Sequence, residues 1–471
     1  MDAGVASQQP SSSYVRAEGP KLFLDGQPFR FEGFNAQQTL SWAASGSPTL
    51  MAELEALFAD AQQLGLRVAR VWASHVGPKM LPPFLDGFNE RVAPQFAEPP
   101  SILVMQPAPG ELNETVLQAL DLVLDAAGRH GIKLTLNLAD YTGRFGPSLP
   151  GIEPYIQWVA GTLNLTGYTV LDFFEDERAK LLFKHRVCAL ASRRSSVDGV
   201  RYRDSPHIFA WDLLNEPRCP ACPGGPAPLV AWADEMSSIL TCIDPNHMVG
   251  ISTEGFFSEA DPQYIPANPG PWALCEGVGF CELASLPHIS YGAAHMYAST
   301  RGTWDEATRS TCGWDCAMRW FRSWMAAHFD ASSVVTGKPF VLEEFSAQWS
   351  EEQRNDMFRL EAFASEWVNA SSVAAGAVFW GGTVGDHVDW DGWQIRLDGG
   401  RSVPAPFEQA DLLKQGMPPE QKQRDEADKA CQAAVKAKYA SVFAGYGSNS
   451  TFCRRADAPA RGRDEGASEN N

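Results

Sequence analysis

Eight short apolar runs, separated by segments with helical spacing, constrain the fold of this 471-residue chain more than any other feature. Runs of this length are typical of strands buried on both faces, as in parallel sheets. The predicted strands are residues 29–35, 66–73, 132–140, 208–214, 247–253, 289–297, 340–345 and 374–380. The predicted helices are residues 50–64, 114–130, 173–193, 228–242, 314–329 and 351–370. This alternation, without an internal repeat, predicts an α/β fold, a (β/α)8 TIM barrel with long insertions in its βα loops.

The domain organisation follows from shifts in composition along the chain. Residues 15–400 contain all of the predicted strands and are long enough for one barrel. Residues 401–453 turn charged and predict a helical extension that packs on the barrel. Residues 1–14 and 454–471 are polar, and we expect them to be disordered tails.

The acidic composition limits the partners of the chain. A formal net charge of −19 disfavours nucleic acid, anionic membrane surfaces and acidic polysaccharides. No apolar run has the length of a membrane helix. We therefore expect neither nucleic acid nor membrane as a partner, whereas a neutral polymer is compatible with the charge.

The ten cysteines favour disulfides over a metal site. Several fall into short-range couples, without the accompanying His or Cys quartets of a zinc site. The couples are Cys219 and Cys222, Cys275 and Cys281, and Cys312 and Cys316, while Cys431 and Cys453 could tie the C-terminal extension. Four Asn-x-Ser/Thr acceptor sequences agree with a secreted protein. The N-terminus MDAGVASQQPSSS lacks an apolar region, so a signal peptide is absent or already removed.

Polar and aromatic residues follow the apolar runs at the strand ends where TIM barrels place their active sites. They are Asn35, Arg70, Trp72, Asn137, Asp140, Asn215, Glu216, Glu254, His295, Tyr297, Glu344 and Trp380. Buried polar groups are costly unless they have partners, and a purely structural barrel has little reason to gather them at one end. This agreement predicts a functional site there.

Two glutamates at strand ends stand out. Glu216 ends the stretch IFAWDLLNE, and Glu344 lies in KPFVLEEFSA. A single Asn-Glu-Pro is equally compatible with a solvated loop acid, but two such glutamates converge if both strands lie parallel in one sheet. Hydrolysis of a glycosidic bond needs a proton on the leaving oxygen and negative charge near the anomeric carbon, and two carboxyls meet both needs.

Asn215-Glu216-Pro217 and Glu344-Phe345 resemble the acid/base and nucleophile signatures of glycoside hydrolase family five. The wording AWDLLNEPRC is especially similar to endo-β-1,4-mannanases of fungi and plants, and the resemblance extends over residues 15–398. It implies that Glu216 is the acid/base and Glu344 the nucleophile of a retaining reaction, about 5 to 5.5 Å apart. Glu343 is the rival nucleophile. Because neighbours in a strand point to opposite faces, we expect only one of the two to point inward, and the motif selects Glu344.

The resemblance also implies supporting roles. Arg70 would hydrogen-bond the nucleophile and keep it ionised, although an ordinary core ion pair is the alternative. Asn215 would hold the sugar 2-hydroxyl. His295 would tune the acid/base and Tyr297 would bond the nucleophile, since their spacing places both on one face of a strand.

Trp380 would form the platform of the −1 subsite, with Trp72 as a further substrate-binding residue. The chain departs from the family at Ser346, where relatives have Gly, and at Leu138, where some place a Trp. The segment 77–110 has no clear counterpart and leaves endo or exo action open.

The leading hypothesis is a secreted, monomeric, retaining endo-β-1,4-mannanase that acts on mannan, glucomannan, galactomannan or manno-oligosaccharides. This chemistry requires no cofactor or metal. An exo-β-mannosidase or a β-1,4-glucanase on the same scaffold is the alternative. A non-catalytic glycan-binding barrel is a third hypothesis, although such a barrel should have lost a carboxylate or the arginine that this chain keeps.

Overall fold

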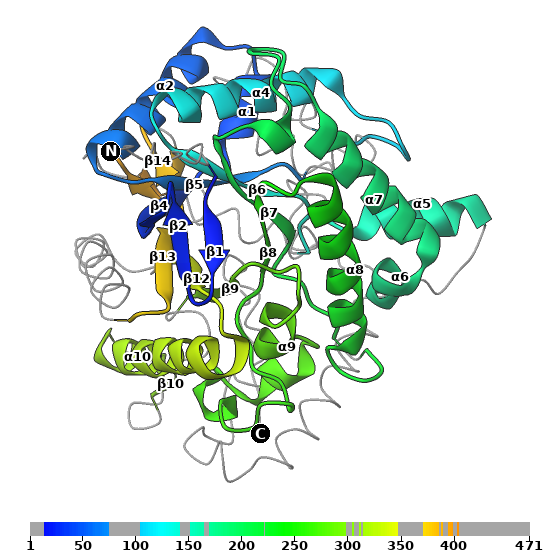
Figure 1. Ribbon diagram of the computed structural model, residues 1–471, viewed down its shortest axis with the longest axis vertical. Coiled ribbons are helices and arrows are strands. Elements are labelled where there is room, and N and C mark those ends of the chain that lie inside the picture. The colour runs from blue at the N-terminus through cyan, green and yellow to red at the C-terminus, as the bar shows by residue number, and fades with distance from the viewer. Residues whose placement is uncertain are drawn as a thin grey trace, which may run out of the picture.

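Figure 1 shows a computed structural model of the protein, in which eight parallel strands form the central sheet. The structure describes residues 14–74, 104–141, 151–163, 169–220, 222–297, 304–305, 310–311, 314–346, 371–385, 388–389, 394–398 and 403–404. The strands are β4 (Phe31–Asn35), β5 (Val68–Trp72), β6 (Lys133–Asn137), β7 (Ile208–Asn215), β8 (Met248–Ser252), β9 (Gly292–Met296), β12 (Phe340–Phe345) and β13 (Ala374–Phe379). Each matches one of the eight predicted strands to within a few residues.

The sheet curls into a barrel. Its order is β8-β7-β6-β5-β4-β13-β12-β9, and every ladder between neighbours is parallel. The two outer strands approach each other, because the Ser290 N–H donates to the Val249 carbonyl at 2.7 Å and the Thr253 hydroxyl donates to the Ala293 carbonyl at 2.8 Å. The predicted (β/α)8 TIM barrel is confirmed.

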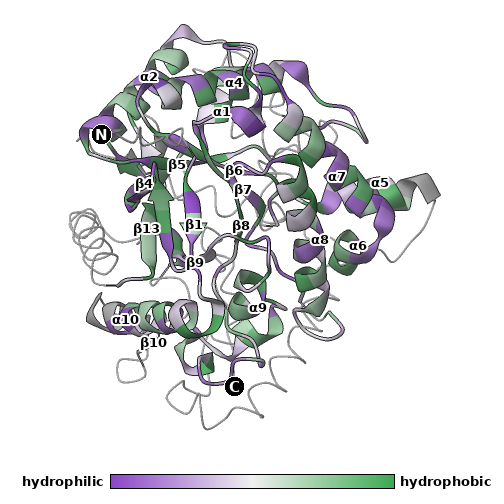
Figure 2. Cartoon of the chain, in the orientation of Figure 1, coloured by the Kyte–Doolittle hydropathy of each residue, from purple (hydrophilic) through white to green (hydrophobic). Residues whose placement is uncertain are grey.

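Helices surround the strands. They are α1 (Thr39–Ala44), α2 (Pro48–Gln63), α4 (Glu114–Arg129), α5 (Glu153–Leu163), α6 (Val170–Glu175), α7 (Glu177–Ser192), α8 (Ala227–Ile243), α9 (Phe280–Ala284) and α10 (Trp314–Ala331). Short 3-10 turns occupy Tyr202–Asp204, Ile265–Ala267 and Pro271–Cys275, and a π-helical turn, Ser332–Thr336, follows α10. In Figure 2, α2 and α4 mix hydrophobic and hydrophilic residues along their length, whereas strand β13 is largely hydrophobic. This contrast is expected when a helix buries one face and a barrel strand buries both.

The predicted helix 173–193 is two helices. The chain leaves the helical conformation at Asp176, which separates α6 from α7. The Asp176 carboxylate accepts the Arg178 N–H at 2.8 Å and so caps the start of α7. The continuous apolar spacing concealed a cap inside the segment.

A small antiparallel sheet that was not predicted from the sequence covers the base of the barrel. It consists of β1 (Arg16–Glu18), β2 (Lys21–Leu24) and β3 (Gln27–Pro28). Its residue Leu22 packs in one buried cluster with Phe29, Phe31 and Phe209, and the last two rings lie 5.0 Å apart. The apolar base of the barrel is thus closed to water, and the opposite end is left for the site.

The remaining strands are two-residue pairings. They are β10 (Trp304–Asp305), β11 (Ser310–Thr311), β14 (Gly382–Thr383), β15 (Val388–Asp389), β16 (Ile395–Arg396) and β17 (Val403–Pro404). The predicted helix 351–370, residues 1–13 and 454–471, and all of the extension 401–453 except 403–404 lie outside the described residues. The insertion 77–110 is described only from residue 104.

One predicted cysteine couple forms a disulfide. Cys219 and Cys222 are bonded. Cys281 is a buried thiol, so the prediction that it pairs with Cys275 is wrong. The side chains of the couple at 312 and 316, and of the pair at 431 and 453, lie outside the described part of the chain. Among the described residues, no helix is long and apolar enough to span a bilayer.

We expect Gly33→Ala to destabilise the barrel. A Cβ at this position would lie 2.3 Å from the Val68 carbonyl oxygen on the neighbouring strand β5. That oxygen belongs to a strand fixed on both sides and cannot yield, so we expect a loss of about 3 kcal/mol or more in the free energy of unfolding. Denaturant unfolding measures it. Leu64→Ala, at a side chain that is 58% exposed, is the control and should change stability by less than about 0.5 kcal/mol. Equal midpoints for the two variants would contradict the packing argument.

Candidate active site

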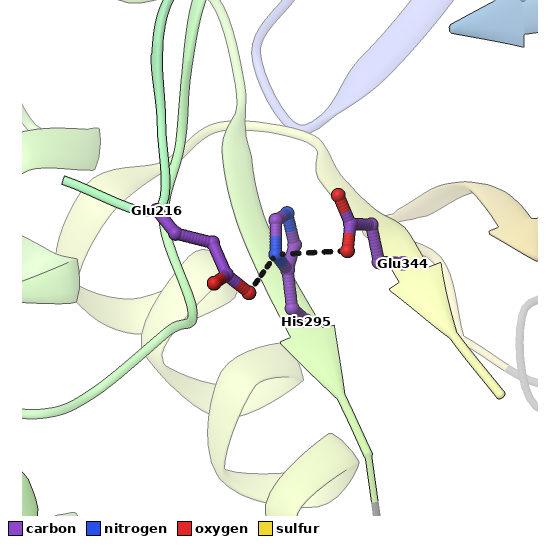
Figure 3. Close-up of side chains that lie close together, drawn as sticks. All are labelled: Glu216, His295 and Glu344. Atoms are coloured by element: carbon purple, nitrogen blue, oxygen red, sulfur yellow. Dashed lines mark hydrogen bonds and ion pairs between the residues drawn. The ribbon is translucent and has the colours of Figure 1, made fainter. Parts of the chain in front are cut away.

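Glu216, His295 and Glu344 meet at the C-terminal end of the barrel (Figure 3). Glu216 follows β7, His295 lies on β9 and Glu344 lies on β12. The His295 Nδ1 lies 2.9 Å from Glu216 Oε1 and 3.5 Å from Glu344 Oε2. Strands far apart in the sequence therefore bring two carboxyls to one imidazole, as the sequence predicted.

Arg70, on β5, is the buried centre of the site. Its Nη1 donates to Glu344 Oε1 at 2.6 Å and its Nε donates to Asp212 Oδ2 at 3.0 Å. Its Nη2 donates to Asn215 Oδ1 at 2.6 Å and to Ser252 Oγ at 2.7 Å. The predicted contact between this arginine and Glu344 is present, within a larger network.

Both neighbouring glutamates point into the barrel, so the prediction that only one does is wrong. Glu344 accepts from Arg70 and from the Tyr297 hydroxyl, the latter at 2.6 Å. Glu343 accepts from the Ser252 hydroxyl at 2.5 Å and lies 3.0 Å from the Tyr291 hydroxyl. The register between β12 and its neighbours shifts at this point. Such a bulge interrupts the alternation of side chains on which the prediction relied.

The backbone at Glu216 is held in an unusual conformation. Its φ is +44°, in the left-handed region that side chains other than Gly rarely adopt. The Glu216 N–H donates to the Ser252 carbonyl at 2.8 Å. Arg218, which is fully buried, donates to Glu254 with two 2.5 Å bonds and to Glu276 at 3.1 Å. Together with the Cys219–Cys222 disulfide, these bonds fix the loop and aim the glutamate at the site.

The two predicted tryptophans differ in accessibility. Trp380 directly follows β13, is half-buried, and packs edge-on against Trp72 with ring centroids 5.3 Å apart. Trp72 is 1% exposed, its Nε1 donates to Asp140 at 2.9 Å, and the Arg70 guanidinium lies 4.5 Å from its ring. Trp380 can therefore face a ligand, while Trp72 supports it from behind.

Burial dominates the electrostatics of the site. It raises the pKa of the Glu344 carboxyl above its ordinary value, although the charges of His295 and Arg70 oppose that rise. Burial lowers the pKa of His295, but the Glu344 and Glu216 carboxyls more than offset this and raise it overall. The carboxyls around Arg70 raise its pKa, despite burial, so it stays charged.

The carboxyls of Glu216 and Glu344 are close enough to act on one atom. One oxygen of each and one His295 ring nitrogen lie within 4.8 Å of one another. Three such atoms can hold a cation in other proteins. We assign none here, because each of the three residues is engaged in a hydrogen bond of the cluster. That the reaction needs no metal or cofactor stays a prediction.

Four residues of this cluster were not predicted from the sequence: Asp212, Arg218, Ser252 and Tyr291. Each lies in or beside an apolar strand run and is buried. A charged or hydroxyl side chain inside such a run is costly without a partner. Asp212, inside the apolar run AWDLLNE, was therefore the one available signal. It indicates that a buried partner exists but does not identify that partner.

Comparison with known proteins agrees with this geometry. Residues 12–365 match the family described as glycoside hydrolase family five, β-mannosidase-like. The chain is 32% identical to mannan endo-1,4-β-mannosidase 7 of Arabidopsis thaliana, over 79% of this chain and 78% of that protein. It is 31% identical to mannan endo-1,4-β-mannosidase 8 of Oryza sativa subsp. japonica, over 78% and 90%.

Solved structures point the same way. An endo-β-1,4-mannanase from Thermotoga petrophila superposes with a TM-score of 0.63 at 26% identity, over 87% of this chain and 78% of that one. A family-five mannosidase from Rhizomucor miehei shares the fold, with a TM-score of 0.62 at 20% identity over 91% of this chain and all of that one. The chain belongs to glycoside hydrolase family five, among its β-mannosidase-like members.

Proposed function

We propose that the protein is a retaining endo-β-1,4-mannanase that hydrolyses internal bonds of mannan, glucomannan or galactomannan. The observation that carries the proposal is the pair of carboxyls, Glu216 and Glu344, with oxygens within 4.8 Å in a member of this family. Inverting glycosidases need about 6.5–9.5 Å between carboxyls to admit a water, so this spacing favours retention. The matched plant relatives are named for cleavage inside mannan.

The reaction proceeds in two displacements. Glu344 attacks the anomeric carbon while Glu216 gives its proton to the glycosidic oxygen. The bond between that carbon and that oxygen breaks, the leaving sugar departs as an alcohol, and a covalent glycosyl ester with Glu344 remains on the enzyme. Glu216, now a carboxylate, takes a proton from water, and the resulting oxygen displaces Glu344 from the sugar. Both carboxyls return to their initial states, and the sugar keeps its anomeric configuration.

The surrounding residues prepare these steps. Arg70 and Tyr297 each donate to Glu344, which favours its ionised form for attack. His295 holds Glu216 in place. The Asn215 side-chain carbonyl accepts from Arg70, and the amide nitrogen lies 3.5 Å from Asp140 Oδ2. The second N–H of that amide is the donor that would bind the sugar 2-hydroxyl. Trp380 offers a half-buried ring for the CH face of the sugar at the −1 subsite, with Trp72 behind it.

The protein is proposed to be secreted. The Cys219–Cys222 disulfide supports an oxidising compartment. A monomeric state also stays a prediction.

Product sizes test the substrate. Incubation with mannohexaose and galactomannan should yield mannobiose and mannotriose, and carboxymethylcellulose should yield nothing, because the −1 pocket is expected to select an axial 2-hydroxyl. Chromatography of the products over time measures this. Mannose as the sole early product would contradict endo action and indicate an exo-β-mannosidase. Cleavage of carboxymethylcellulose would indicate a β-glucanase.

Chemical rescue tests the two carboxyl roles. Glu216→Ala should lower kcat on galactomannan by about 10²–10⁴-fold, because a general acid and base is lost. Azide should restore its turnover of an aryl β-mannoside and give the β-azide, since azide then replaces the base. Glu344→Ala should be inactive and yield the α-azide, because azide then replaces the nucleophile.

The folding control is Glu235→Ala, at a surface glutamate that binds Lys180 and Lys184. It should keep wild-type kcat. Full activity of Glu344→Ala, or an α-azide from Glu216→Ala, would overturn the assignment of roles.

A further inference from the structure

A hydrogen-bonded chain links Glu343 to the acid/base. The Glu343 Oε2 lies 2.5 Å from the Ser252 hydroxyl, which lies 3.1 Å from the Nε2 of His295. The opposite ring nitrogen, Nδ1, lies 2.9 Å from Glu216 Oε1. Ser252 and His295 are fully buried, so the chain connects two carboxyls without passing through bulk water.

The hydroxyls beside Glu343 cannot satisfy every carboxylate at once. Tyr291 has one hydroxyl proton, and its oxygen lies 3.0 Å from Glu343 and 3.2 Å from Asp212. Asp212 has the Arg70 guanidinium as a counterion. Among the described residues, the Glu343 carboxyl forms no ion pair, and its hydrogen-bond partners are the hydroxyls of Ser252 and Tyr291. Of the two acids, Glu343 is therefore the one suited to hold a proton.

A protonated imidazole between two ionised glutamates fits this geometry, as the raised pKa of His295 allows. Two arrangements with the same number of protons and a neutral ring fit it as well. In the first, Glu343 is ionised, Ser252 donates to it, His295 is protonated on Nε2, and Glu216 carries a proton that it donates to Nδ1. In the second, Glu343 is protonated and donates to Ser252, which donates to Nε2, and Nδ1–H donates to ionised Glu216. In both arrangements the Ser252 oxygen accepts two hydrogen bonds. One comes from Arg70, and the other comes from His295 in the first arrangement and from Glu343 in the second.

We propose that Glu343 and Ser252 are positioning residues that share the acid/base proton with Glu216 through His295. Conversion between the arrangements moves a proton from Glu343 to Ser252, another from Ser252 to Nε2, and a third from Nδ1 to Glu216. Glu343 loses one proton, Glu216 gains one, and Ser252 and the neutral ring keep theirs. The inference rests on the proposed role of Glu216 as acid/base.

The charges around the chain make this exchange accessible near neutral pH. Burial and the Asp212 carboxylate raise the pKa of Glu343 to about 7, against the opposing effects of Arg70, Ser252 and His295. The groups that face Glu343 are Arg70 on β5, Asp212 on β7, Ser252 on β8, and Tyr291 and His295 before and on β9. Glu216 faces His295 and Glu344. The pKa at which the chain loses its last acidic proton then belongs to Glu343 and Glu216 together, not to either residue alone.

Sharing extends activity to higher pH. When two acids hold one proton, the proton is lost at a higher pH than from either acid alone, and the ionised partner also repels the second negative charge. Since glycosylation needs a proton on Glu216, the basic limb of the kcat/KM profile should report this shared ionisation.

Glu343→Gln tests the proposal, because it keeps the shape but cannot release a proton. We expect the basic limb of kcat/KM on an aryl β-mannoside to move to lower pH by about one unit, with the acidic limb unmoved. A basic limb that coincides with the wild type would overturn the proposal.

A matched pair of hydroxyl variants distinguishes an effect transmitted by the hydrogen-bonded chain from an electrostatic effect of Glu343 through space. The same pair tests the proposal if Glu343→Gln does not fold. Ser252→Ala cuts the link to His295, so its basic limb should move in the same direction as that of Glu343→Gln. Tyr291→Phe removes the other hydroxyl beside Glu343 but leaves the link intact. Its limb should stay, or move to higher pH, because ionised Glu343 loses a donor. A wild-type limb in Ser252→Ala would overturn the chain.

Nitrogen NMR of His295 reads the same ionisation without substrate. Its ring signals, assigned by their absence in His295→Gln, should titrate at the midpoint of the basic limb in the wild type and at lower pH in Glu343→Gln. Failure of the mannanase proposal would leave the protein inactive on every β-mannan with this NMR difference intact. Identical titrations in an active enzyme would reject the shared proton alone.

Discussion

The buried guanidinium of Arg70 is the constraint on which the rest of the site depends. Arginine has five N–H donors, and each finds an acceptor here: Asp212 from Nε, Asn35 and Glu344 from Nη1, and Asn215 and Ser252 from Nη2. A charge that is fully buried is tolerated when its donors are all paired, and removal of any partner leaves a costly orphan. Because these partners come from four strands, β4, β7, β8 and β12, the arginine fixes the spacing of the catalytic end of the barrel.

Register shifts let this small ring of strands carry so many polar groups. A regular strand presents every second side chain to the interior. Yet β7 offers both Asp212 and Asn215 to Arg70, and its pairing with β8 shifts between those two positions. On β12 a comparable shift brings neighbouring glutamates into the same interior. Each shift adds one polar side chain to the site without adding another strand.

The sequence predicted the barrel and the principal site residues for different reasons. Strands such as Ile208–Asn215 are apolar over most of their length, so their burial can be predicted from the local sequence alone. Glu216 and Glu344 were found because motifs name them. Ser252 and Tyr291 were not found, since a hydroxyl gains meaning only from partners that lie far away in the chain. The N-terminal sheet was not predicted because its strands are only two to four residues long, and its one buried residue, Leu22, packs against the finished barrel.

The partners of the two adjacent glutamates also bear on which of them attacks the sugar. A nucleophile must be ionised at the moment of attack, and Glu344 has a guanidinium and a phenol as donors. Glu343 has hydroxyls alone, beside a second carboxylate. Four acids, Asp212, Glu216, Glu343 and Glu344, surround one guanidinium and one imidazole, and they cannot all be ionised in a buried space. Glu344 lies against the Arg70 guanidinium and so carries the negative charge, whereas Glu343, whose carboxyl contacts hydroxyls, is free to share a proton with the acid/base.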